Sequence, residues 1–223
     1  MKQITDAAQI EEYYNHFPLM DYFNFDVLPF TKILQFEPDE LILQEGASPD
    51  YLFYLFDGRA KLFLTHENGR ISLVNFLSAP CFIGEMELLD AQRYANGVKA
   101  ITVCTCFAIQ TSFCKERLLQ DNKFLRHICV FLGKKAIGNT AHYSKNQTYS
   151  LDVRLANFIL TTAHNQYYRE KHTEVSEFLG VTYRHLLYVL ANFVKCGYLK
   201  KTEQGYYIQD LNTLRKIAEG IKS

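Results

Sequence analysis

HTEVSEFLGVTYRHLLYVLANFVKCGYLKKTEQG, residues 172–205, decides the fold of the C-terminal part of this 223-residue chain. It contains a short helical pattern, a turn residue at Gly180, a second helical pattern and then a hairpin rich in lysine. Glycine suits the turn because it adopts the left-handed backbone conformation without steric strain. This order predicts a winged helix-turn-helix, a fold that places its second helix in the major groove of DNA.

The side chains of this segment divide into an expected core and expected DNA contacts. Arg184 carries a guanidinium fork that can bind guanine or a phosphate, whereas lysines of the hairpin add affinity and salt dependence without sequence preference. Thr173 and Thr182 can cap the two helices through their hydroxyls. We expect Val175, Phe178, Leu179, Leu186, Leu187 and Leu190 in the core, and DNA contacts at Thr173, Thr182, Tyr183, Arg184, His185, Tyr188, Lys200 and Lys201. Two alternatives share the pattern: a winged helix that contacts only proteins, and an ordinary pair of helices.

The net charge of the chain is zero, but its two halves carry opposite charges. Residues 1–113 contain 7 Lys and Arg against 15 Asp and Glu, and residues 114–223 contain 17 against 9. This segregation indicates that the basic half meets a polyanion, unless the two domains simply differ in surface composition. Residues 146–223 hold only 10 basic against 7 acidic residues, so one copy of the DNA-binding domain should bind DNA weakly.

The middle of the chain, residues 31–113, consists of short apolar runs separated by turn residues. Closely spaced strands of this kind predict an all-β sandwich or barrel rather than alternating strands and helices. A hairpin turn is expected at residues 66–69, because Asn-Gly tolerates the positive φ angles of tight turns. The aromatic-rich residues 1–30 suggest short helices packed over one edge of this domain.

A long helix is predicted over residues 113–144, with two apolar stripes. One stripe contains Phe124, Ile128 and Phe131. A helix that is apolar on two faces needs two partners, so the β domain and the same helix of a second copy are expected on either side, unless the helix is buried in one monomer. The polar residues 145–148 are the expected hinge, and an amphipathic helix follows over residues 151–164. The expected dimer stripe is Leu125, Cys129, Leu132, Ala136 and Tyr143.

Several classes of protein are disfavoured by composition. The chain has no apolar run of about 18 residues and its N-terminus is acidic and polar, so we expect a cytoplasmic protein without a membrane span. Its six scattered cysteines are expected to be reduced and mostly buried. A metal oxygenase of the cupin type is disfavoured because residues 31–113 contain one histidine, His66, and no P-loop, nucleophile elbow or HExxH motif occurs.

Taken in order, these segments resemble the Crp/Fnr family of bacterial transcription regulators over residues 20–223. The resemblance rests on Gly46 in LILQEG, on DYLFYL followed by Gly58, on Gly84-Glu85-Met86, and on DVRLA at residues 152–156. The phrases FIGEMELL, NGVKAITVC and YRHLLYVLANF look most similar to the YeiL branch of that family. The resemblance implies an α+β protein with a cyclic-nucleotide-binding-type β-roll (a double-stranded β-helix or jelly roll), a long dimerisation helix and a winged helix-turn-helix. It also implies a homodimer on a palindromic DNA site.

The chain departs from the family pattern where relatives bind their signals. Members that bind cyclic AMP use the Glu of Gly-Glu for the ribose and an Arg before Ser/Thr-Ala for the phosphate. In this chain Tyr94 occupies the phosphate Arg position and Arg93 lies one residue away, so we expect no cyclic AMP binding. We expect no iron–sulfur cluster either, since no cysteine precedes Cys81. Cys104 and Cys106 should share one face of a strand, as core residues or in a redox or metal role.

The recognition helix departs as well, because Tyr183, Arg184 and Tyr188 stand where many members have Arg, Glu and Arg. The operator should therefore differ from the common one. The expected domains are a β-roll domain with N-terminal helices at 1–112, a dimerisation helix at 113–145 and a DNA-binding domain at 146–223. The effector-pocket candidates are Gly84, Glu85, Met86, Arg93 and Tyr94.

We therefore expect a transcription regulator that is not an enzyme and needs no cofactor or metal. Its expected partners are double-stranded DNA, a second copy of the chain, RNA polymerase if it activates transcription, and an unidentified small-molecule effector. The alternative is a small-molecule or redox sensor that acts through protein contacts without DNA.

Overall fold

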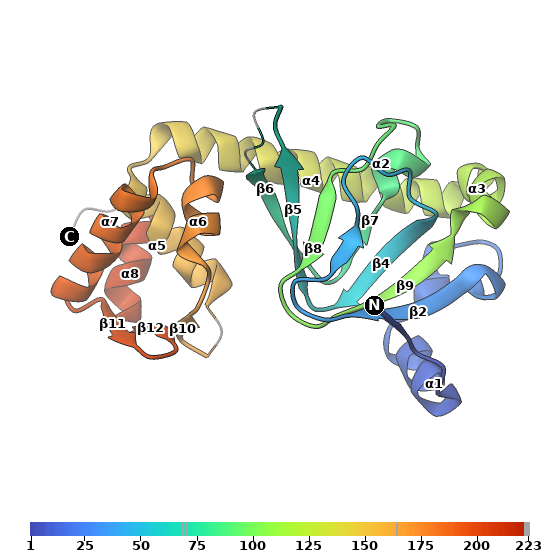
Figure 1. Ribbon diagram of the computed structural model, residues 1–223, viewed down its shortest axis with the longest axis horizontal. Coiled ribbons are helices and arrows are strands. Elements are labelled where there is room, and N and C mark those ends of the chain that lie inside the picture. Colours follow the sequence, from blue (N-terminus) through green and yellow to red (C-terminus); the bar gives the residue numbers. More distant parts are fainter. Residues whose placement is uncertain (68, 70, 164, 221–223) are drawn as a thin grey trace. The chain divides into compact units, whose positions relative to one another are not determined.

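The computed structural model describes residues 1–67, 69, 71–163 and 165–220 and divides into two compact units, Met1–Lys134 and Lys135–Ser223. Figure 1 shows the first unit as strands with helices at their edge, and the second as a bundle of helices with a small sheet. The division falls inside one helix, α4 (Asn122–Thr148). No helix of the described ranges is long and apolar enough to cross a membrane.

The described strands of the first unit form two antiparallel sheets, which confirms the predicted all-β core (Figure 1). The five-stranded sheet has the order β1 (Lys2–Gln3), β2 (Thr31–Phe36), β9 (Cys104–Gln110), β4 (Tyr51–Asp57), β7 (Cys81–Ile83). The four-stranded sheet has the order β3 (Leu41–Leu43), β8 (Gly97–Ala100), β5 (Arg59–Thr65), β6 (Ile71–Ser78). Asn68 of the predicted hairpin turn lies outside the described residues.

Both faces of the five-stranded sheet are buried, which explains its nearly continuous apolar runs. In β4, Phe53 and Leu55 belong to the core cluster that also contains residues of the four-stranded sheet, whereas Leu52, Tyr54 and Phe56 belong to the cluster under the helices. The alternation follows from the two-residue period of a strand. Apart from the exposed edge strand β1, the sheet is therefore buried on both sides and lies at the centre of the unit.

The predicted N-terminal helices are present and cover one side of the five-stranded sheet. They are α1 (Ala7–His16) and two short 3₁₀ segments, Leu19–Tyr22 and Leu28–Phe30. Aromatic pairs join α1 to the sheet, with ring centroids 5.2 Å apart for Tyr13 and Phe56 and 5.0 Å apart for Tyr14 and Phe107. The aromatic-rich N-terminus is therefore part of the core.

The prediction of one helix over residues 113–144 is wrong. The structure has α3 (Thr111–Gln120) and then α4, separated by Asp121. The buried Asp121 carboxylate accepts hydrogen bonds from the backbone N–H groups of Asn24 (2.6 Å), Lys123 (2.9 Å) and Phe124 (3.2 Å). It therefore caps α4 and ties this helix to the N-terminal segment.

The end of α4 also differs from the prediction. Residues 145–148 were expected to form a hinge, but α4 continues to Thr148 and the interruption comes at residues 149–150, before α5 (Leu151–Thr162). The four polar residues have no helix-breaking Pro or Gly, so polarity alone did not end the helix.

The second unit confirms the predicted winged helix-turn-helix. After α5 it contains β10 (Tyr167–Tyr168), α6 (His172–Phe178), α7 (Tyr183–Lys195), β11 (Leu199–Thr202), β12 (Gly205–Ile208) and α8 (Leu211–Ala218). The wing sheet has the order β10-β12-β11, so the two-stranded hairpin expected from the sequence gains a third strand. The strand β10 and the helix α8 were both missed.

Candidate DNA interface

The turn between α6 and α7 is built largely as the sequence predicts. Gly180 has a φ of +63°, and the Thr182 hydroxyl accepts a hydrogen bond of 3.2 Å from the backbone N–H of His185, which caps α7. The predicted cap at Thr173 is wrong. The N-cap position of α6 is Lys171, and Thr173 is exposed within the helix, where its backbone carbonyl accepts a bond from Ser176.

The faces of α7 separate core residues from candidate DNA contacts. Leu186, Val189, Leu190 and Phe193 are buried. At about 100° of rotation per residue, Arg184 and Tyr188 lie on the opposite face, and both are exposed, with Tyr188 65% accessible. Tyr183 and Leu187 share one flank, and His185 lies on the other. Leu187 is only half-buried, so its assignment to the core is wrong, whereas Val189 is a core residue that was missed.

The wing presents two lysines on β11, an edge strand that pairs with β12. Lys200 and Lys201 are exposed on β11. In the antiparallel register, Lys201 lies opposite Tyr206 of β12. Gly205 has a φ of +118°, and a Cβ there would lie 2.3 Å from the carbonyl oxygen of Tyr168. Only glycine fits this position, so it sets the close approach of β10 to the wing.

Arg154 holds the turn of the helix-turn-helix in place. Its guanidinium donates to the carbonyl of Leu179, at the end of α6, and to the carbonyl of Tyr149, 3.1 Å away. Burial lowers the pKa of Arg154. This contact gives a physical role to the DVRLA motif, because the arginine of the motif fixes the residue before Gly180.

A hollow of about 510 Å³ lies between the start of α7 and the wing, and the sequence did not reveal it. His172 is half-buried in it, with its ring stacked on Tyr168 (centroids 6.2 Å apart) and tilted against Tyr206 (5.6 Å). Burial, and secondly the positive charge of Lys201, lower the pKa of His172. The hollow is lined by Tyr168, Arg169, Glu170, His172, Tyr183, Leu187, Lys201, Thr202, Glu203, Gln204, Gly205 and Tyr206.

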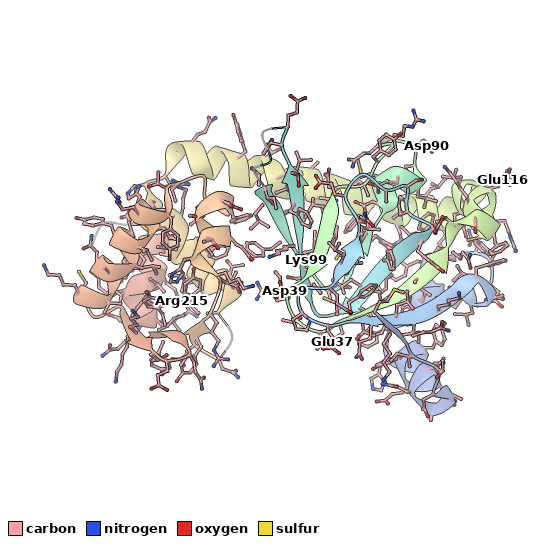
Figure 2. All side chains as sticks on the ribbon, viewed as in Figure 1. Glu37, Asp39, Asp90, Lys99, Glu116 and Arg215 are labelled. Atoms are coloured by element: carbon pink, nitrogen blue, oxygen red, sulfur yellow. The ribbon has the colours of Figure 1, made fainter. Side chains whose placement is uncertain are left out.

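Of the effector-pocket candidates of the first unit, Gly84 and Arg93 line one hollow of about 440 Å³, whereas Glu85, Met86 and Tyr94 are not part of its lining. Gly84 has a φ of +90° and opens α2 (Glu85–Leu88), where Glu85 is only 2% exposed and Met86 is half-buried. Arg93 and Tyr94 are exposed and stack on each other, with the guanidinium 5.3 Å from the ring centroid. Asp90, after α2, lies at the surface of the first unit (Figure 2). Its carboxylate pairs with the Lys115 ammonium at 2.7 Å.

Cys104 and Cys106 both lie in the core between the two sheets and are 0% exposed. The Cys104 thiol donates to the Arg59 carbonyl at 3.1 Å, and burial raises the pKa of Cys104 to about 11. Burial also raises the pKa of Cys106. Over the part of the chain that the structure describes, no three His, Cys, Asp or Glu side chains are grouped as metal ligands.

The predicted dimer stripe of α4 is only partly exposed. Leu125 and Leu132 pack against the core of the first unit, whereas Cys129, Ala136 and Tyr143 are exposed. The predicted second stripe is confirmed, because Phe124, Ile128 and Phe131 join the same core. Further apolar residues, missed in the sequence, extend the exposed face: Val130, 51% accessible, and Ile137, 72% accessible.

Comparisons with known proteins agree with this architecture. Residues 33–121 match the family described as the cyclic nucleotide-binding domain. The chain is 45% identical to the regulatory protein YeiL of Escherichia coli O157:H7 over 198 residues, which are 89% of this chain and 90% of that protein.

Solved structures show the same fold at low sequence identity. A CRP-family transcriptional regulator from Thermus thermophilus aligns with a TM-score of 0.71 at 19% identity, over 83% of this chain and 96% of that one. The c-di-GMP-responsive global regulator CLP of Xanthomonas campestris aligns with a TM-score of 0.68 at 17% identity, over 92% of this chain and 100% of that one.

Proposed function

Because this chain belongs to the Crp/Fnr family of transcription regulators, in the branch of the regulatory protein YeiL, we propose that it binds a palindromic DNA site as a homodimer. The observation that carries the proposal is the exposed face of α7. Arg184 and Tyr188 lie there opposite the buried leucines, and Lys200 and Lys201 are exposed on the wing that follows. A helix face of this kind fits the major groove, and wing lysines fit the phosphates beside it.

The roles of the contacts follow from their chemistry. Arg184 can donate two hydrogen bonds to one guanine, which makes it the residue that discriminates between bases. Tyr188 can contact a thymine methyl or a phosphate. Thr182 is already engaged as the helix cap, so its hydroxyl positions α7. Lys200 and Lys201 supply affinity that falls as salt concentration rises.

The exposed face of α4 supports a second copy of the chain as the partner. Val130, Ile137 and Tyr143 are apolar or aromatic side chains open to solvent, and Gly133 and Ala136 between them are small enough for a close approach of two helices. A twofold dimer presents two copies of α7 related by symmetry, and dimers of this kind read palindromic half-sites about one helical turn of DNA apart. Two weakly basic domains together bind more strongly than one.

We further propose that the β-roll does not bind cyclic AMP and that the protein carries no iron–sulfur cluster. Support for the first comes from Arg93, which is exposed and stacked on Tyr94, while Glu85 is buried. Support for the second comes from the burial of Cys104 and Cys106. Titration calorimetry with cyclic AMP should give no heat of binding at micromolar concentrations, and a clear micromolar isotherm would contradict the first proposal. Broad iron–sulfur absorbance in anaerobic spectra would contradict the second.

The test of DNA binding is a gel-shift with duplexes of random sequence and with fragments of a genome that encodes a relative. We expect retention of both at low salt and of a few genomic fragments at higher salt, because only specific sites keep their base contacts when counterions compete. Absence of any shifted duplex at low salt would reject the proposed function. RNA polymerase enters as a partner if the retained sites lie upstream of activated promoters.

A further inference from the structure

The hollow between α7 and the wing lies on the surface assigned to DNA. The recognition helix contributes Tyr183 and Leu187 to its lining, and the wing contributes Lys201 and the turn residues Glu203 and Gln204. Its volume of about 510 Å³ is typical of a site for a small group. A nucleic acid that contacts both α7 and the wing must therefore pass over this hollow.

The fixed charges of the lining cancel. Arg169 and Lys201 are cations, and Glu170 and Glu203 are carboxylates. On α6 itself, Lys171 before His172 and Glu174 after it also have opposite charges. The remaining titratable groups facing His172 are the phenols of Tyr168, Tyr183 and Tyr206, which are neutral near pH 7. The protonation of His172 therefore decides whether the hollow is neutral or positive.

His172 is placed to change its charge near neutral pH. Its ring is half-buried between Tyr168 and Tyr206, and Lys201 disfavours the imidazolium form. Both effects lower the pKa of His172 and therefore favour the neutral ring in the free protein. An anion in the hollow has the opposite effect, because it stabilises the imidazolium directly.

We propose that this hollow is a phosphate subsite of the DNA interface, occupied by a backbone phosphate when His172 is protonated. The inference rests on the proposed DNA-binding function and adds a regulation to it. Binding DNA then takes up one proton per protomer, and the affinity for DNA rises as the pH falls. The protein acquires a DNA affinity that depends on pH through one identified ring.

The first experiment measures the affinity for a fluorescent duplex of random sequence, at constant ionic strength, between about pH 8 and about pH 5.5. The wild type should bind about tenfold more tightly at the lower pH, which corresponds to a pKa shift of one unit on binding. His172→Gln should lose this dependence. His16→Gln, which removes an exposed histidine of α1 in the first unit, should keep it. An unchanged pH profile in His172→Gln would overturn the proposal.

The second experiment uses the salt dependence of binding, which counts phosphate contacts. Lowering the pH should steepen the slope of log K against log salt by about 0.9 per protomer in the wild type, and should leave it unchanged in His172→Gln. Circular dichroism checks that the variant folds. Should it not fold, Lys201→Gln replaces it: removing the neighbouring cation should move the pH transition of DNA binding upward. A transition that stays in place or moves down would overturn the proposal.

The third experiment follows the His172 ring by NMR in the free protein, with duplex DNA, and with inorganic phosphate. We expect its pKa to rise with the duplex. An equal rise with inorganic phosphate alone would show a site for free anions and overturn the assignment to DNA. If no duplex binds at any pH, the proposed function itself fails. If duplexes bind and the pH profile is the same for the wild type and His172→Gln, the proposed phosphate subsite is rejected, but the proposed DNA-binding function is not.

Discussion

The two units bring their expected functional residues together to different extents. In the second unit, Arg184 and Tyr188 are exposed on one face of α7, and Lys200 and Lys201 are exposed on the next strand. In the first unit, Glu85 is buried, whereas Arg93 and Tyr94 face solvent. Helix periodicity over a few residues brings the DNA contacts onto one surface. In contrast, the residues of the effector pocket come together only when strands that are distant in the sequence pair. Local sequence patterns therefore predict the DNA surface far better than the effector pocket.

The largest effect is expected from a substitution that prevents dimerisation, because the proposed palindromic site is read by two copies of the second unit. Ile137→Glu places a charge on the exposed face of α4, where a dimer would bury it without a partner. We expect a monomer in analytical ultracentrifugation and a loss of DNA affinity of about 100-fold or more, since such a charge costs about 3–5 kcal/mol.

Val74→Glu is the matched control, because Val74 of β6 is also an exposed apolar residue, 45% accessible. It should leave both the dimer and the DNA affinity unchanged. A dimeric Ile137→Glu protein would rule out this face of α4 as the interface.

The next largest effect is expected from a substitution on the recognition helix α7 of the second unit. Arg184→Ala removes the guanidinium fork from the face of α7 opposite the core, so binding to the operator should weaken by about 1–3 kcal/mol and lose preference at one base pair. Competition assays with single-base operator variants measure both changes. Arg215→Ala, which removes an exposed arginine from α8 (Figure 2), is the control and should change neither. Equal operator affinity in the two variants would remove Arg184 from the base contacts.

Smaller effects are expected from the loss of one helix cap in each unit, measured as free energies of unfolding. Asp121→Ala removes the buried cap that joins α4 to Asn24, so the first unit should lose about 1–2 kcal/mol of unfolding free energy. Asp210→Ala removes the cap of α8, whose carboxylate bonds the backbone N–H of Thr213 at 2.9 Å. It should destabilise the second unit by less, because Asp210 is only half-buried, whereas Asp121 is 5% exposed. Urea unfolding followed by hydrogen exchange in each unit measures both, and a larger loss in Asp210→Ala would contradict this ranking.

The smallest effect is the pH dependence of stability in the second unit. The folded pKa of His172 is below its ordinary value of 6.5, so the unfolded chain binds more protons as the pH falls through 6.5. The second unit should therefore lose stability from about pH 7 down to the lowered pKa, and His172→Gln should reduce that loss. Urea unfolding at the two ends of this range tests the sign; a gain in wild-type stability at the lower pH would contradict it.

Residues with local roles were easier to predict from the sequence than residues whose partners are distant in the chain. Gly180 and Thr182 have a local role in the helix-turn-helix, and both were predicted correctly. Asp121 was missed as a helix break because its partner Asn24 lies 97 residues away in the chain. Thr173 was assigned to a cap from its residue type alone, but the N-cap of α6 lies two residues earlier, at Lys171.

The hollow was missed for a similar reason. Its lining joins residues 168–172, the start of α7 and the turn of the wing, which only the third strand β10 brings together. Two-residue strands such as β10 leave no periodic pattern in a sequence. A signal did exist in the aromatic composition of residues 167–172, which contain two tyrosines and a histidine.

The most direct test of the central claim is selection of bound duplexes from a fully randomised DNA library by the purified protein. We predict enrichment of a palindrome whose half-sites are about one helical turn apart, centre to centre. We also predict that Arg184→Ala enriches the same palindrome with one position of each half-site relaxed. Enrichment of a single unpaired half-site would contradict the dimer, and a library that stays random after selection would contradict DNA recognition altogether.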